Sequence, residues 1–203
     1  MSANTLGAGG LASGVLLVLA GCAGFHSDQA ATQVYTLEPA FTESKPETEG
    51  NATRTLQVRR PQAAPGLDTD RIALRRSAQR LDYYAASRWP APLPDLLQSL
   101  AIEALRASGK FRAVQPDTAA FAADEILQIE IRRCQAEYAG DGPPVVRLQL
   151  LATLGHRSDR AVVTSVRAES TVPAAENRMQ AVVAAFQSAA AAALAELASR
   201  LPP

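Results

Sequence analysis

The sequence lacks an excess of charge of either sign. Its 203 residues include 20 Lys and Arg and 20 Asp and Glu, so the formal net charge is zero. A nucleic-acid-binding surface needs a basic excess to displace the counterions of the phosphate backbone. Aromatic residues, on which unpaired bases stack, make up only 5% of the chain. We therefore expect no nucleic-acid partner, while a hydrophobic content of 47% suffices for the core of one domain.

Cysteine and histidine are also scarce, with two of each. The sequence has no CxxC pair and no Cys/His cluster, so we expect no metal site. It also has no Gly-x-Ser-x-Gly motif and no Gly-rich phosphate loop, which argues against the hydrolysis of esters or of ATP. The sequence therefore predicts a protein without catalysis and without a cofactor. Cys134 lies in an alternating apolar segment and is expected to be a small buried residue rather than a reactive thiol.

The N-terminus has the pattern of an export signal. Residues 11–20 form an apolar run of about ten residues, which suits the h-region of a signal peptide and is too short to span a bilayer. The run leads into Leu19-Ala20-Gly21-Cys22, which matches the lipobox of bacterial lipoprotein precursors. The thiol of Cys22 would accept diacylglycerol, and cleavage would free its amine for a further acyl chain. Two or three chains give a stable membrane anchor.

Two features near the cleavage site refine this hypothesis. Residues 1–10 contain no Lys or Arg, which departs from the usual basic n-region and leaves open a buried apolar helix instead. Ala23 follows the cysteine at the position where Asp favours retention in the inner membrane, so the outer membrane is favoured. The expected parts are a signal peptide at 1–21, the lipidated cysteine and tether at 22–32, and one domain at 33–203, with a probable loop insertion at 40–53.

Beyond the tether, hydrophobic periodicity predicts both helices and strands. Apolar residues at helical spacing predict one helix over 93–109, with Gly109 at its C-terminal end, and a second over about 175–200. Period-two alternation predicts a three-stranded meander over 125–172 with a bulge near Arg133. Shorter strands are expected near 34–37, 56–58, 71–74 and 81–84. The sequence therefore predicts an α+β two-layer sandwich with both helices on one face of a mostly antiparallel sheet.

Three aromatic residues before the first helix are candidate partner contacts. Trp89 is the only tryptophan; packing against the helix start is the favoured interpretation, and the alternative is an exposed ring that contacts a partner. Tyr83 and Tyr84 are adjacent on a predicted strand and face opposite ways, so one is expected in the core and the other is available to a partner. Asp68 and Asp70 lie two residues apart, where turn and capping roles outweigh weak calcium binding.

The polar side of the expected meander carries further arginines. Arg132 and Arg147 lie opposite the apolar residues of their strands. They would either meet anionic lipid head groups or belong to a solvated sheet face, and the second interpretation is favoured. The polar turn at 155–160, which includes His156, is expected to be solvated.

The order of these segments resembles a known family. A Tyr-x-Leu strand at 35–37 follows the lipobox, and the segment RWPAPL at 88–93 leads into the first helix. That helix ends in Ser-Gly and is followed by FRAV at 111–114. In this order and spacing, from about 33 to 200, the chain resembles the ABC-type transport auxiliary lipoprotein family, which includes the lipoprotein of the paraquat-inducible Pqi system.

The resemblance implies a role in an envelope lipid transport system built on MCE-domain proteins. The expected partners are an MCE-domain protein, its associated ABC permease and ATPase, and the bilayer that holds the acyl anchor. The lipoprotein would face the periplasm and act as an adaptor or a conduit component. The resemblance leaves open a homo-oligomer. The alternative is a structural envelope lipoprotein that binds another outer-membrane assembly or peptidoglycan.

Overall fold

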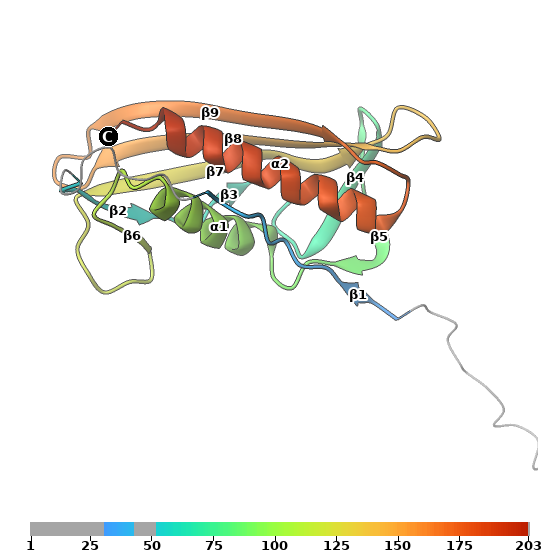
Figure 1. Ribbon diagram of the computed structural model, residues 1–203, viewed down its shortest axis with the longest axis horizontal. Helices are drawn as coiled ribbons and strands as arrows, with labels where there is room; N and C mark the ends of the chain where they lie inside the picture. The colour runs from blue at the N-terminus through green and yellow to red at the C-terminus, as the bar shows by residue number, and fades with distance from the viewer. Residues whose placement is uncertain (1–30, 43–51, 203) are drawn as a thin grey trace, which may run out of the picture. The chain divides into compact units, whose positions relative to one another are not determined.

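A computed structural model describes residues 31–42 and 52–202. The lipobox, the tether up to residue 30 and most of the expected loop insertion lie outside the described residues. The described chain forms nine strands and two helices (Figure 1). In chain order they are β1 (Gln33–Val34), β2 (Thr55–Val58), β3 (Gln62–Ala63), β4 (Arg71–Ser77), β5 (Arg80–Arg88), α1 (Leu93–Ala107), β6 (Ala113–Pro116), β7 (Glu125–Glu137), β8 (Val145–His156), β9 (Val162–Pro173) and α2 (Met179–Arg200).

Strand β7 pairs with other strands along both of its edges. One of its edges pairs antiparallel with β8 over its whole length, and β9 continues the meander beyond β8. Its other edge pairs in turn with β2, β3 and β4, each in parallel. Beyond these, β6 adds to β2, and β5 and then β1 add to β4. The register of β7 with β8 shifts between Ile131 and Arg133, which confirms the predicted bulge.

The sheet is mixed, which corrects the expectation of a mostly antiparallel sheet. The hairpin-linked pairs β4–β5, β7–β8 and β8–β9 are antiparallel. The remaining pairs are parallel, because the chain returns to β7 and β6 through long connections that include α1. Alternating side chains report which face of a strand is buried and carry no information on the direction of its neighbour. The α+β class and the two helices are confirmed.

Both helices pack against the sheet and against each other (Figure 1). Helix α1 begins with Pro94 and Asp95 in its first turn and ends before Gly109, whose φ of 67° suits a glycine after a helix. Helix α2 begins at Met179, a few residues later than expected. Among the described residues, α2 is the one helix long and apolar enough to cross a bilayer, but 56% of that apolar stretch is buried inside the domain. We therefore interpret it as a core helix.

The sheet has a buried face and a polar face. Along β8, Val146, Leu148 and Leu150 are fully buried, while the intervening Arg147 and Gln149 are partly exposed. The same alternation continues in β7 and β9. The buried side chains meet the apolar sides of α1 and α2, so the core lies between the helices and the sheet. Polar groups able to meet a ligand or partner gather on the other face.

Trp89 belongs to this core. Its side chain is 2% exposed, and its ring packs edge-to-face on Phe186 of α2 with the ring centroids 5.4 Å apart. Its backbone N–H donates to the carbonyl of Asp70 at 2.7 Å, which holds the chain at the entry to α1. The structure thus shows the packing role, and it corrects the alternative of an exposed partner contact.

We predict that Trp89→Ala lowers the free energy of unfolding by about 3–5 kcal/mol, because it leaves a cavity in a close-packed core. Urea denaturation followed by circular dichroism measures this loss. As a control, Phe121→Ala removes an aromatic ring that is 77% exposed and should change the free energy of unfolding by less than about 0.5 kcal/mol. Equal effects of the two substitutions would contradict the placement of Trp89.

Asp124 fixes the start of β2 beside the start of β7. Its Oδ2 accepts hydrogen bonds from the backbone N–H and the hydroxyl of Thr55, both at 2.7 Å. The carbonyl of Thr55 in turn accepts from the N–H of Asp124 at 3.0 Å. The hydrogen bonds from the Thr55 backbone and side chain hold the pKa of Asp124 below its usual value of 3.8.

This lowered pKa predicts a pH dependence. A carboxyl group whose pKa falls on folding stabilises the protein above its unfolded pKa, and that stability is lost as the pH falls through the folded pKa. Between about pH 5 and pH 2, the melting temperature of the wild type should therefore fall more steeply than that of Asp124→Asn. Parallel curves over this range would show that the carboxylate is not stabilised by folding.

Candidate functional site

The candidate partner contacts within the described chain do not form one site. Leu19, Ala20, Gly21 and Cys22 lie outside the described residues, and Trp89 lies in the core. Tyr83 and Tyr84 are adjacent on β5 and have different neighbours.

Tyr83 and Tyr84 are both half-buried and engaged within the domain. The hydroxyl of Tyr83 donates to the carbonyl of Gly66 at 2.8 Å, and the Arg71 guanidinium lies 3.9 Å from its ring centroid. The hydroxyl of Tyr84 lies 2.9 Å from that of Tyr138. Burial, together with this hydrogen bond, raises the pKa of Tyr84 well above its usual value. The role of either tyrosine as a partner contact stays a prediction.

The two aspartates considered for calcium are paired with arginines. Arg60 contacts Asp68 at 2.8 Å and Asp95 at 2.5 Å, and the hydrogen bond from Arg60 lowers the pKa of Asp68. Asp70 lies 3.5 Å from the guanidinium of Arg88. These pairs favour the structural role for both carboxylates. Within 31–42 and 52–202, no group of three or more His, Cys, Asp or Glu side chains could hold a metal ion.

Arg132 and Arg147, the arginines considered for lipid contact, are also paired. Arg132 lies 2.6 Å from Glu130, and Arg147 lies 2.8 Å from Glu137 and 4.0 Å from Glu169. Positive and negative charges thus alternate across the middle of the polar face. This pattern agrees with the solvated sheet face, which is also the interpretation that the sequence favours.

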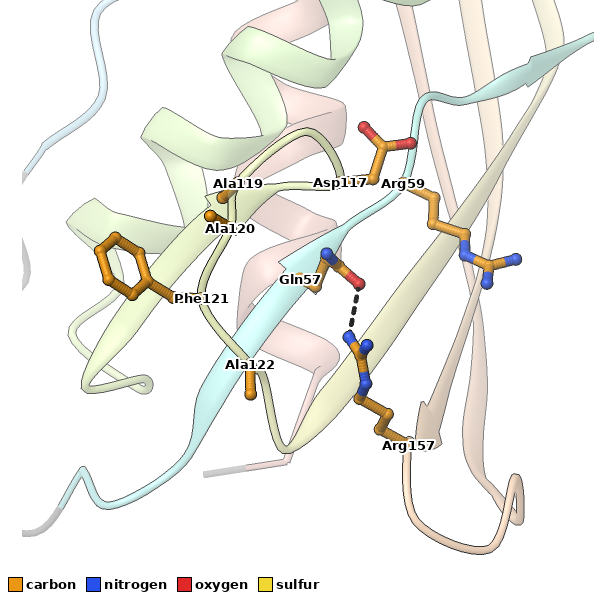
Figure 2. Close-up of a pocket in the computed structure, with 8 residues that line it drawn as sticks. All are labelled: Gln57, Arg59, Asp117, Ala119, Ala120, Phe121, Ala122 and Arg157. Carbon is orange, nitrogen blue, oxygen red and sulfur yellow. Dashed lines mark hydrogen bonds between the residues drawn. The ribbon is translucent and has the colours of Figure 1, made fainter.

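Two adjoining hollows lie at one end of the polar face, where β2, the start of β7 and the β8–β9 turn meet. Figure 2 shows the residues that line one of them. Each has a volume of about 560 Å³, and both are lined by Gln57, Arg59 and Arg157. The loop 117–122 borders one of them, and Arg160 lines the other. We call the two hollows together the arginine cleft.

Backbone hydrogen bonds position two of the three arginines of the cleft, Arg59 and Arg157. Arg59 directly follows β2, and its N–H donates to the carbonyl of Leu127 at 3.0 Å. Arg157 opens the β8–β9 turn, and its N–H donates to the carbonyl of Asp124 at 2.9 Å. Its guanidinium donates to Oε1 of the buried Gln57 at 3.3 Å, as Figure 2 shows. Side chains about 100 residues apart in the chain therefore converge on one hollow.

The third arginine occupies an unusual backbone conformation. Arg160 has a φ of 61°, in the left-handed region that glycine and asparagine adopt at least cost. The turn is held on both sides of it: the N–H of His156 donates to the carbonyl of Ala161, and the N–H of Ala161 donates to Oδ1 of Asp159, each at 2.9 Å. The chain thus keeps a long cation at a position where a smaller residue would be less strained.

The two hollows of the cleft differ in charge. The hollow over β7 and β8 is lined by ten residues, all within the described chain, which include three arginines and His156 but no carboxylate. The other hollow includes Asp117, whose two oxygens accept from the side chain of Gln98 at 2.9 Å and the N–H of Arg60 at 3.2 Å. Although burial opposes it, these hydrogen bonds lower the pKa of Asp117. Such a surface can bind an anion through charge-assisted hydrogen bonds.

Sequence reasoning missed the arginine cleft. It predicted the turn at 155–160 but assigned no role to Arg157 and Arg160. The signal that was available is local: a hairpin turn that carries arginine where glycine is the usual residue. Convergence with Arg59 depends on the parallel pairing of β2 with β7, which the sequence did not indicate.

The comparisons with known proteins identify the family. A family model described as the ABC-type transport auxiliary lipoprotein component matches residues 35–198. No curated protein matches the chain. Among solved structures, the protein XCC0632 from Xanthomonas campestris is 31% identical, with a TM-score of 0.73 over 82% of this chain and 92% of that one. An uncharacterised protein with 13% identity and a TM-score of 0.61, over 84% of this chain and all of its own, shows a similar fold alone.

The family match and the similarity to XCC0632 both extend over most of the domain that follows the tether. They agree with the order of segments from Tyr-x-Leu, which follows β1 and is not itself a strand, to the C-terminal helix. The chain belongs to the ABC-type transport auxiliary lipoprotein component family.

Proposed function

We propose that this protein is a lipid-anchored accessory component of an ABC/MCE-type system that moves lipid between the membranes of the cell envelope. It faces the periplasm, most favourably from the outer membrane, and acts as an adaptor or conduit component without catalysis. The observation that carries the proposal is the order of the chain: a lipobox ending at Cys22 comes directly before a transport auxiliary domain that the family model matches from residue 35.

The length of the tether supports an anchored adaptor. The segment between Cys22 and the first strand spans at most roughly 35 Å, at ~3.5 Å per residue. Acyl chains on Cys22 would therefore keep the domain near one bilayer while leaving it free to meet partners from the periplasm. The polar sheet face, with its paired charges, is suited to a reversible protein contact.

The hollows of the domain support an adaptor over an enclosing carrier. Seven of the ten residues that line the hollow over β7 and β8 have polar side chains, and four of the eight that line the other hollow do. A protein that engulfs an acyl chain needs a deep, mostly apolar cavity. We therefore assign passage of the acyl chains to the partner complex, and we assign docking or guidance to this protein.

We predict that Cys22→Ser abolishes anchoring. Wild-type protein should sediment with membranes, and the variant should be recovered in the soluble fraction, because the acyl acceptor is missing. Cys134→Ala is the matched control: Cys134 is buried, with a pKa raised by desolvation to about 12, so its removal should leave the protein on the membrane. A Cys22→Ser protein that still sediments with membranes would contradict the anchor.

We also predict that the tagged full-length lipoprotein, crosslinked in cells and purified, recovers an MCE-domain protein together with its permease or ATPase. Mass spectrometry of the crosslinked species identifies the partners. Recovery of peptidoglycan or of a different outer-membrane assembly, with no MCE-domain protein in repeated experiments, would favour a structural envelope role and contradict the proposal.

A further inference from the structure

The arginines of the cleft differ from those elsewhere on the polar face. Arg132 and Arg147 each lie within an ion pair with a neighbouring glutamate. Arg59, Arg157 and Arg160 are exposed, and within the described part of the chain none of them lies at ion-pair distance from a carboxylate, although the charge of Arg59 acts on Asp117 across one hollow. A single unpaired surface arginine is ordinary, but three from two distant segments that line one hollow concentrate positive charge in it.

The strained backbone of Arg160 also supports a binding role for the cleft. Glycine at position 160 would adopt the observed backbone more easily than arginine does. A residue held in a sparsely populated conformation by its surroundings suggests a use for its side chain. The side chain of Arg160 lines the same hollow as Arg59 and Arg157. The strained conformation therefore accompanies a third cation in that hollow.

The donors of the cleft fit a tetrahedral oxyanion. Arginine guanidinium groups bind phosphate through paired hydrogen bonds, and they do so best where no carboxylate competes. Gln128 and Thr153 line the same hollow and add uncharged donors. Several donors around one space suit a group with several charged oxygens, such as a phosphoryl group.

Apolar side chains at the rim indicate that the ligand is amphiphilic. The described residues include four large hydrophobic side chains that are exposed, and three of them lie at or beside the cleft. Phe121 is 77% exposed and borders one hollow, and its ring points away from the other lining side chains (Figure 2), so it could contact only a part of the ligand that extends beyond the hollow. Val162 is 66% exposed and lines the other hollow, next to Val163. Free phosphate has no apolar group that could contact this surface.

We infer that the arginine cleft binds the phosphoryl group of an anionic glycerophospholipid, with the glycerol and the first carbons of the acyl chains against the apolar rim. The choice of a lipid as the source of the phosphoryl group rests on the proposed function. The choice of a phosphoryl group rests on the cleft alone. The elements that carry the cleft residues, β2 and the β8–β9 turn, lie at the end of the sheet opposite β1 (Figure 1).

Calorimetry on the purified mature lipoprotein in a neutral detergent tests this inference. The probes are short-chain phosphatidylglycerol, short-chain phosphatidylcholine and inorganic phosphate. We expect phosphatidylglycerol to bind more tightly than the other two. Arg59→Gln and Arg160→Gly should each weaken the binding of phosphatidylglycerol and of phosphate roughly tenfold, because each loses a charge-assisted hydrogen bond. Arg167→Gln, an exposed arginine of β9 outside the cleft lining, is the matched control and should leave both affinities unchanged.

Arg160→Gly separates binding from folding. It removes the cation and relieves the backbone at once, so its melting temperature should equal or exceed that of the wild type while binding falls. Wild-type affinity for phosphatidylglycerol in both cleft variants would overturn the inference. Equal affinity for phosphate and phosphatidylglycerol, unaffected by Val162→Ser, would overturn the lipid as the ligand. Because the assay uses the lipoprotein alone, its outcome is independent of whether an MCE-domain partner is recovered.

Discussion

The structure depends on the pairing of β7 along both of its edges. Strand β8 pairs with one edge over its whole length, and the short strands β2, β3 and β4 share the other. Strands of two to four residues have no stability alone, so β2 and β3 are ordered by the long strand beside them. Because the helices cover one face of this sheet, the polar groups of β2, β7 and β8 are held together on the other. The arginine cleft is a consequence of that arrangement.

The elements that were predictable from sequence are those whose pattern is local and long. Helix α1, the meander of β7, β8 and β9, and the bulge near Arg133 all follow from the spacing of apolar residues within one segment. The parallel pairings were missed, since direction depends on where a long connection returns. Strand β3 was missed because two residues show no period. The burial of Trp89 depends on Phe186, almost 100 residues further along the chain.

A net charge of zero conceals how the charges are distributed. In the middle of the polar face, arginines alternate with glutamates and form pairs, so this surface presents little net potential. At its end, Arg59, Arg157 and Arg160 line one hollow without a carboxylate. The composition argues against an extended basic surface for nucleic acid, and it is compatible with a compact site for one anionic group. Charge segregation on the scale of a few residues becomes visible only once the strands are paired.

The chain belongs to the family of transport auxiliary lipoprotein components. We propose that acyl chains on Cys22 hold it at a membrane. Mass spectrometry of the N-terminal peptide of the mature protein tests this claim most directly. We expect a peptide that begins at Cys22 and carries the added mass of a diacylglycerol group and a further acyl chain. A peptide that begins upstream of Cys22, or one that begins there with an unmodified cysteine, would contradict it.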